Sequence, residues 1–137
     1  MKLIPFIIPL TAVLVSASSS SSSVGYDPEY DNGAISVDSV TCSGALKAKG
    51  YTTFGSLPSF PHIGGAYVVE GSSSPSCGTC YELSYTDKSI YVTAIDSAGQ
   101  GFNIAQKALE ALGGQEAVDA GHISASAKEV DGSNCGF

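Results

Sequence analysis

Short stretches in which apolar and polar residues alternate dominate the chain and predict β-strands. The alternation is clearest in residues 81–85 and 90–94, which the turn-forming residues 86–89 separate. Because successive strand side chains point to opposite faces, these stretches predict a β-hairpin with one buried face. Residues 34–40 and 66–69, which contain β-branched and aromatic side chains, are predicted to form two further strands.

One segment has helical periodicity. Residues 104–112 place their apolar side chains on one stripe, with Asn103 before them as the predicted N-cap and Gly113 and Gly114 after them as the predicted end. Residues 115–120 add a further helical turn. Loops rich in Gly and Pro separate these elements, so the sequence predicts a mainly β domain, a small closed or nearly closed barrel with short helices.

The N-terminal region differs in composition from the rest. Residues 1–17 combine Lys2, an apolar run and small residues at the end, which is the order of a secretory signal peptide. The apolar run is too short for a membrane span, so no membrane association is expected. Residues 18–25 are rich in Ser and are predicted to be a flexible leader, and residues 26–137 to be the folded domain.

Secretion changes the interpretation of the four cysteines, because an oxidising compartment favours structural disulfides over a redox Cys-x-x-Cys motif. Four cysteines allow three pairings, and spacing alone does not choose between them. A bond between Cys77 and Cys80 would close a small strained ring. We therefore favour Cys42 with Cys77 and Cys80 with Cys135, which closes two long loops that each stabilise the fold by roughly 4 kcal/mol in the chain-entropy model.

Composition narrows the range of functions. The 137 residues suffice for one domain, and they carry a net charge of −7 with no Arg, which argues against nucleic-acid binding. Removal of a signal peptide that contains Lys2 takes the charge to −8. Trp is absent, so a sugar-binding surface would have to use Tyr and polar groups.

Asp96 is the first candidate functional residue, because it stands where the best-formed predicted strand passes into a loop that contains Gly99 and Gly101. It has two interpretations of equal weight, a ligand-binding carboxylate or an acceptor for the amides of its own loop. A glycosidase would need a second carboxylate on the other side of the bond, and spacing marks none. Tyr51 and Thr53 are the next candidates, either in a polar groove or on one face of a buried strand.

The remaining polar residues form no convincing cofactor or metal motif. His62 and His122 lack metal-ligand spacing, and residues 99–101 lack the βαβ context of a dinucleotide loop. The acids in residues 27–31 alternate as in a calcium loop, but Pro28 interrupts the pattern, so a turn with exposed acids is preferred. We expect no cofactor and no bound metal.

Several sequence strings closely resemble the cerato-platanin family of small secreted fungal proteins, and together they span the chain from Tyr26 to Cys135. They are residues 26–31, 40–43, 50–58, 60–65, 77–80 and 94–104. The chain departs from the family where Ser97 replaces a frequent His and where Tyr81 replaces a common Trp. Residues 70–73 also differ from the usual pattern.

The resemblance implies a six-stranded double-ψ β-barrel, as in expansins, with the disulfide pairing favoured above. It implies a secreted protein of the fungal cell wall that binds chitin and N-acetylglucosamine oligomers, loosens polysaccharide without hydrolysis and elicits plant defence. Cellulose is a second candidate polysaccharide, a plant receptor is left open as a partner, and a monomer is expected. By position, the sugar groove would involve Asp96, Asn103, Thr41 and Ser43, to which we add Tyr51 and Thr53.

The sequence therefore leaves three hypotheses for the function. The leading hypothesis is a non-catalytic binder of wall glycans and elicitor, in which Asp96 accepts hydrogen bonds from the sugar. The second is a glycoside hydrolase of the related barrel, so a weak glycosidase activity stays open. The third is a surface-active wall component that assembles with itself.

Overall fold

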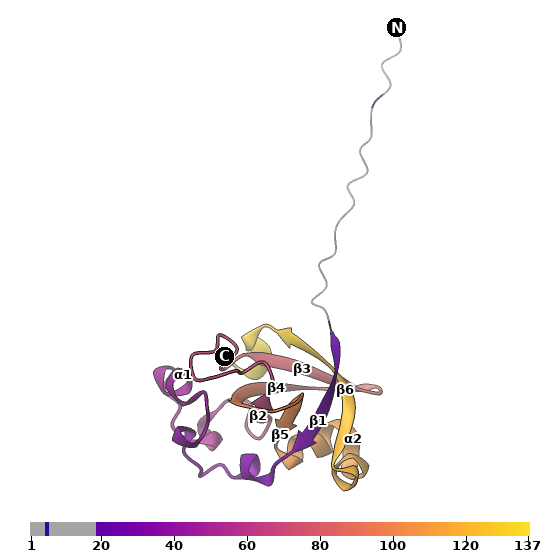
Figure 1. Cartoon of the computed structure of the whole chain (residues 1–137), viewed down its shortest axis with the longest axis horizontal. Coiled ribbons are helices and arrows are strands. Elements are labelled where there is room, and N and C mark those ends of the chain that lie inside the picture. The colour runs from indigo at the N-terminus through magenta and orange to yellow at the C-terminus, as the bar shows by residue number, and fades with distance from the viewer. Residues whose placement is uncertain (1–4, 6–18) are drawn as a thin grey trace.

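Six strands form a closed barrel in the computed structural model of the chain, which describes Pro5 and residues 19–137. The neighbours around the barrel follow the order β1-β5-β2-β4-β3-β6 (Figure 1). The strands are β1 (Ser20–Tyr26), β2 (Ile63–Ala66), β3 (Cys80–Tyr85), β4 (Lys88–Ser97), β5 (Phe102–Ile104) and β6 (His122–Val130). The predicted fold, a mainly β six-stranded double-ψ barrel with short helices and two disulfides, is confirmed.

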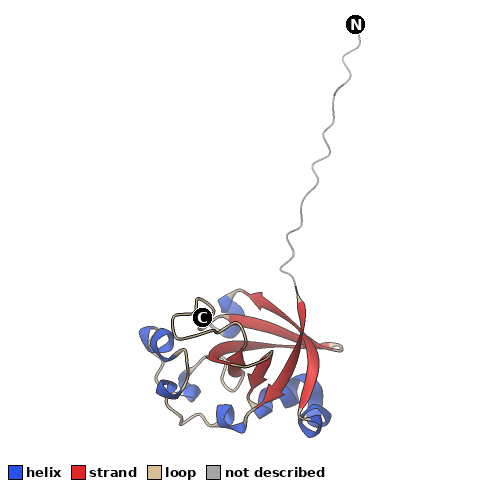
Figure 2. Ribbon diagram, viewed as in Figure 1, coloured by secondary structure: helices blue, strands red, loops and turns tan. Residues whose placement is uncertain are grey.

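Short helices surround the barrel (Figure 2). The α-helices are α1 (Ser43–Ala48) and α2 (Gln106–Ala120), and the 3-10 helices are η1 (Pro28–Asp31), η2 (Val37–Ser39), η3 (Phe54–Ser56) and η4 (Gly132–Cys135). Helix α2 packs against β4 and β1 through the buried residues Ala108, Leu109 and Leu112. In the described part of the chain, no helix is long and apolar enough to cross a membrane.

The core fills the inside of the barrel with the inward side chains of the strands. Ile63, Leu83, Ile95 and Ile104 are fully buried, and they come from β2, β3, β4 and β5. Burial of each such side chain contributes about 1.5–3 kcal/mol of transfer free energy. The predicted hairpin is confirmed, because β3 and β4 pair antiparallel from Cys80–Thr93 to Tyr85–Lys88.

The prediction of a flexible Ser-rich leader is wrong for residues 20–25. They belong to β1, which pairs antiparallel with β6 from Ser20–Ala127 to Gly25–His122 and parallel with β5. The barrel therefore begins at Ser20 rather than at residue 26. The serines are poor core residues, but their backbone groups complete the ladders that close the barrel, and Val24 supplies a fully buried side chain.

Three other sequence predictions also fail. Residues 34–40 contain the 3-10 helix η2 (Val37–Ser39) instead of a strand, and of these residues Ser36 alone forms a β-bridge, with Thr53. Strand β2 ends at Ala66, where the strand 66–69 was predicted to begin. Helix α2 starts after Ala105 and passes Gly114 with non-helical backbone angles, so Asn103 is a β5 residue and not an N-cap.

The disulfides join Cys42 to Cys77 and Cys80 to Cys135, as predicted, and no described cysteine is free. The first ties the start of α1 to the loop before β3. The second ties the start of β3 to η4 near the C-terminus. The two bonds therefore anchor the segments that the barrel ladders do not hold.

The double variant Cys80→Ser with Cys135→Ser removes the second disulfide. It is expected to lower the free energy of unfolding by about 2–4 kcal/mol, because the unfolded chain is no longer cross-linked between two residues that are 55 positions apart. Urea denaturation measures this value. The pair Cys42→Ser with Cys77→Ser releases a separation of 35 residues and is expected to lose a similar or slightly smaller amount. A loss below about 1 kcal/mol for the first pair would contradict the chain-entropy account.

Candidate functional site

The candidate site lies where the chain crosses over the end of β2. Strand β2 stands between β4 and β5, so the loop 98–101 that joins β4 to β5 must pass over its end. Gly65 of β2 pairs with Asp96 on one side and with Asn103 on the other. A Cβ atom at Gly65 would lie 2.5 Å from the Ser97 carbonyl oxygen, so glycine permits this close crossing.

The carboxylate of Asp96 accepts four hydrogen bonds from the protein. Its Oδ1 accepts from the Thr41 amide at 3.0 Å, the Thr41 hydroxyl at 2.8 Å and the Ser97 amide at 3.0 Å. Its Oδ2 accepts from the Tyr30 hydroxyl at 2.8 Å. Asp96 thus accepts backbone amides, but they belong to Ser97 of β4 and to the distant Thr41, and not to the loop 98–101 as the second interpretation expected. Asp96 connects the end of β4 to η1 and to the segment before α1, and we call Asp96, Tyr30, Thr41 and Ser97 the Asp96 cluster.

Tyr30 is a permanent hydrogen-bond donor in this cluster. Its side chain is buried, and burial, the bond to Asp96 and the charges of Asp96, Asp27 and Glu29 together raise the pKa of its phenol well above the usual value. The phenol therefore stays protonated throughout the physiological pH range.

The sequence-predicted site residues fall into two groups. Thr41 binds Asp96 directly, Ser43 begins α1 two residues later, and Asn103 lies across Gly65. The other two have different neighbours: the Tyr51 ring packs edge-on against Phe137 at 5.7 Å, and the Thr53 amide donates to Ser56 at 3.2 Å. Among the hydrogen bonds of the described residues, none connects Tyr51 or Thr53 to the Asp96 cluster, and the predicted strand through them is not formed.

A groove adjoins the crossover loop on the outside of the barrel. One hollow of about 470 Å³ includes Asn103 and His122 in its lining, and another of about 460 Å³ includes Ser20–Ser23 and Tyr67. Both are lined by Ser23, Gly99 and Gln100, so they adjoin one another. We call them together the β1 groove. Its full lining is Ser20, Ser21, Ser22, Ser23, Gly25, Tyr67, Ala98, Gly99, Gln100, Gly101, Phe102, Asn103 and His122.

The lining of the β1 groove contains no Asp, Glu, Lys or Arg, although the chain has a net charge of −7. Tyr67 is 48% exposed and presents an aromatic surface at one end, supported edge-on by Phe102 at 6.2 Å. Hydroxyl, amide and imidazole groups provide hydrogen bonds along the rest. An aromatic face beside uncharged polar groups suits an uncharged, hydroxyl-rich ligand.

Sequence reasoning missed Tyr67, Gln100 and His122. Tyr67 was part of a predicted buried strand, and only the early end of β2 places it in the loop that follows. His122 pairs with Gly25 across the β1–β6 ladder, which the prediction of a flexible leader had ruled out. A strand assignment for the Ser-rich segment would have been the signal for this side of the groove.

The acids that suggested a calcium loop have structural partners. Asp27 Oδ1 accepts from the Glu29 amide at 2.9 Å at the start of η1. Both carboxylate oxygens of Asp31 accept amide hydrogens from the first turn of α2, from Gln106 at 2.8 Å and Lys107 at 2.9 Å. The negative carboxylate also complements the positive N-terminal end of the helix dipole.

The family model of cerato-platanin matches residues 22–137. The chain belongs to the cerato-platanin family. The heat-stable 19 kDa antigen of Coccidioides immitis is 41% identical over 133 residues, which cover 95% of this chain and 90% of that protein. Among solved structures, cerato-platanin 3 from M. perniciosa has a TM-score of 0.82 at 40% identity, covering 86% of this chain and 100% of that one.

The solution structure of the fungal elicitor cerato-platanin is a further structural neighbour. It has a TM-score of 0.73 at 37% identity and covers 82% of this chain and 95% of that one. The family resemblance inferred from the sequence strings is thereby confirmed. The replacement of the common Trp by Tyr81 falls inside the barrel, where Tyr81 is 8% exposed. That departure therefore does not remove an exposed aromatic face.

Tyr30→Phe removes one donor from the Asp96 cluster and keeps the ring. We expect it to lower the free energy of unfolding by about 1–3 kcal/mol at neutral pH, because a half-buried anion loses a hydrogen bond. Since folding raises the pKa of Tyr30, the stabilisation is complete below about pH 10, the unfolded pKa, and declines above it. The difference between wild type and Tyr30→Phe should shrink as the pH rises through 10 to 11.

Denaturant unfolding at a series of alkaline pH values measures this difference. Tyr91→Phe is the matched control, because Tyr91 lies at the surface, where water screens its interaction with Glu82. A difference between wild type and Tyr30→Phe that stays constant above pH 10 would show that the bond to Asp96 does not hold the proton of Tyr30.

Proposed function

We propose that this protein is a secreted, non-catalytic binder of cell-wall polysaccharide that takes chitin and N-acetylglucosamine oligomers in the β1 groove. The observation that carries the proposal is the uncharged lining of this groove, with the exposed Tyr67 ring at one end and Asn103 beside the Asp96 cluster at the other. Cellulose is a second polysaccharide of suitable chemistry, since it is also uncharged and rich in hydroxyl groups.

In this proposal a sugar ring stacks on Tyr67, and the side chains of Gln100 and Asn103 exchange hydrogen bonds with hydroxyl and acetamido groups. Both amides offer donors and acceptors, which suits a ligand that also has both. Binding is expected to be weak, because an open groove buries little of the sugar and each hydrogen bond replaces one with water.

Asp96 has two roles in the proposal. Its Oδ1 positions Thr41 and Ser97, and so shapes the start of the crossover loop. Its Oδ2 accepts one hydrogen bond, from Tyr30, and a carboxylate oxygen has capacity for a second. That capacity supports the sequence-based hypothesis that Asp96 accepts a hydrogen bond from a sugar hydroxyl.

The same contacts favour binding over hydrolysis. A glycosidase acid must hold a proton at working pH and release it to the leaving oxygen. The lining of the β1 groove has no Asp or Glu side chain that could do so, and both oxygens of the Asp96 carboxylate already accept hydrogen bonds from the protein. Loosening of polysaccharide without cleavage would follow if contacts in the groove compete with hydrogen bonds between glycan chains.

Elicitation of plant defence is the second part of the proposal. It is supported by the 37% identity with a protein described as a fungal elicitor, over 82% of this chain. The proposal places the protein at the fungal cell wall and outside the cell, in line with the secretory pattern of residues 1–17. Of those residues the structure describes only Pro5, so the signal peptide stays a prediction.

Tyr67→Ala is expected to reduce retention of the protein on insoluble chitin. Stacking of a sugar on an aromatic ring is worth about 1 kcal/mol beyond its buried area, so the binding constant should fall about fivefold or more. Co-sedimentation with increasing amounts of chitin measures it. Tyr67→Phe keeps the ring and should bind as wild type. Equal binding by Tyr67→Ala and wild type would remove the β1 groove from the proposal.

Asp96→Asn is expected to weaken the same retention, because the amide loses acceptor capacity and disturbs the position of Thr41. Asp87→Asn is the matched control: it also removes one negative charge, but from the exposed turn between β3 and β4. The free energy of unfolding is measured for both variants, so that loss of fold and loss of binding are separated. Identical retention of the two variants would contradict a role for Asp96.

Release of reducing ends from soluble chitin and cellulose oligomers is expected to stay at the level of the buffer. A sensitive reducing-sugar assay over hours makes the comparison. Turnover by wild type that Asp96→Asn abolishes would replace the proposed function with the glycoside hydrolase alternative.

A further inference from the structure

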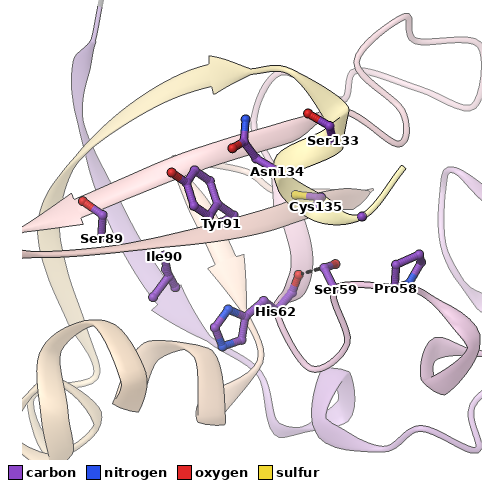
Figure 3. A pocket seen from close by; sticks show the side chains of 10 residues that line it. Pro58, Ser59, His62, Ser89, Ile90, Tyr91, Ser133, Asn134 and Cys135 are labelled. Carbon is purple, nitrogen blue, oxygen red and sulfur yellow. Dashed lines mark hydrogen bonds between the residues drawn. The ribbon is translucent and has the colours of Figure 1, made fainter.

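A second groove lies at the other end of the β2–β4 strand pair (Figure 3). It has a volume of about 500 Å³ and takes its lining from the segment before β2, from β4 and from η4. The lining residues are Pro58, Ser59, His62, Ser89, Ile90, Tyr91, Ser133, Asn134, Cys135 and Gly136. We call this surface the Tyr91 groove. None of its residues belongs to the β1 groove or to the Asp96 cluster.

The Tyr91 groove has the same chemical character as the β1 groove. None of its lining side chains is Asp, Glu, Lys or Arg. Burial lowers the pKa of His62, so its imidazole is neutral at neutral pH. Tyr91 is 37% exposed, and Tyr67 and Tyr91 are the two large hydrophobic side chains of the described residues that are exposed. One of them stands in each groove.

The groove is built on fixed elements. Ser59 donates to the His62 carbonyl oxygen at 2.9 Å and shares a hydrogen bond with the buried Thr93 of β4 at 2.6 Å. The bond between Cys80 and Cys135 holds η4, and Asn134 donates to the Asp131 carbonyl oxygen at 3.1 Å. A surface that is ordered before binding loses little conformational entropy on binding.

A carboxylate lies beside Tyr91. Tyr91 stands opposite Glu82 in the β3–β4 ladder, and its interaction with the Glu82 carboxylate raises the pKa of the phenol. Glu82 in turn faces Lys128 at 3.6 Å, so its charge has a partner. Tyr91 itself is 37% exposed, so its ring is available to a ligand.

From this geometry we propose that the Tyr91 groove is a second saccharide site, in which a neutral sugar ring stacks on Tyr91 and exchanges hydrogen bonds with His62 and Asn134. The ligand class is the same as in the proposed function, on which this inference rests for the choice of probe. A ligand with a charged group would find no charged partner in the lining.

Two such sites would make one molecule bivalent. Tyr91 and Asp96 are five residues apart on β4, which corresponds to roughly 17 Å along the strand at about 3.3 Å per residue. A molecule with two sites can hold two neighbouring glycan chains, or two stretches of one chain, and gains avidity on an insoluble polymer that it lacks for short oligomers.

The test is a titration of the ¹⁵N-labelled protein with N-acetylchitohexaose and, separately, with cellohexaose, followed by the amide shifts of each residue. We expect the amides of His62, Tyr91 and Asn134 to shift with their own saturation curve. Tyr91→Ala should weaken that curve at least fivefold and leave the curve of Gln100 and Asn103 unchanged. Tyr91→Phe, which keeps the ring, should bind with the wild-type saturation curve. Asn134→Ala, at an exposed position, is a second variant of the same groove.

The outcomes separate this inference from the proposed function. Shifts in the Tyr91 groove that Tyr91→Ala removes support the inference, whether or not the β1 groove also responds. The inference is overturned if the shifts are confined to Gln100 and Asn103. It is also overturned if Tyr91→Ala leaves the shifts at His62 and Asn134 intact. Either result leaves the proposed function standing. No specific shifts with either oligomer overturn both.

Discussion

The carboxylate of Asp96 is the contact on which the functional face of the barrel depends. It joins three segments that the strand ladders do not connect: η1 through Tyr30, the approach to α1 through Thr41, and the end of β4 through Ser97. Because the loop 98–101 leaves β4 directly after this point, the carboxylate also fixes where the crossover above β2 begins. The groove that we propose for glycan lies along that crossover, so the Asp96 carboxylate supports both the fold of this region and the proposed binding surface.

The uncharged character of both grooves gives the acidic composition a different meaning. The chain has 13 Asp and Glu residues and a net charge of −7, and none of these acids lies in the lining of the β1 groove or the Tyr91 groove. Asp27 and Asp31 serve as caps, and Asp38 pairs with Lys47 at 2.6 Å. The absence of Trp leaves stacking to Tyr67 and Tyr91, which are the exposed large aromatic side chains among the described residues.

The sequence predicted the elements whose signals are local. The hairpin of β3 and β4 follows from alternation. The observed disulfide pairing is the one favoured from the sequence, although ring strain argued against only one of the two alternatives. The predictions failed where strand pairing between segments far apart in the sequence decides the structure. The serines of β1 form a strand because β5 and β6 pair with it. Residues 34–40 have strand-forming side chains but no partner strand. The family resemblance named Asp96, Thr41 and Asn103, and the structure places them near Gly65 of β2. Tyr67 and His122 could be placed only once the barrel was closed.

The most direct measurement of the central claim is a crystal structure of the protein with N-acetylchitohexaose. The account predicts a sugar ring on the face of Tyr67, further rings within hydrogen-bond distance of Gln100 and Asn103, and an Asp96 carboxylate that still accepts from Tyr30 and Thr41. A sugar chain bound away from the β1 groove, or an Asp96 carboxylate that has left Thr41 to contact a glycosidic oxygen, would contradict it.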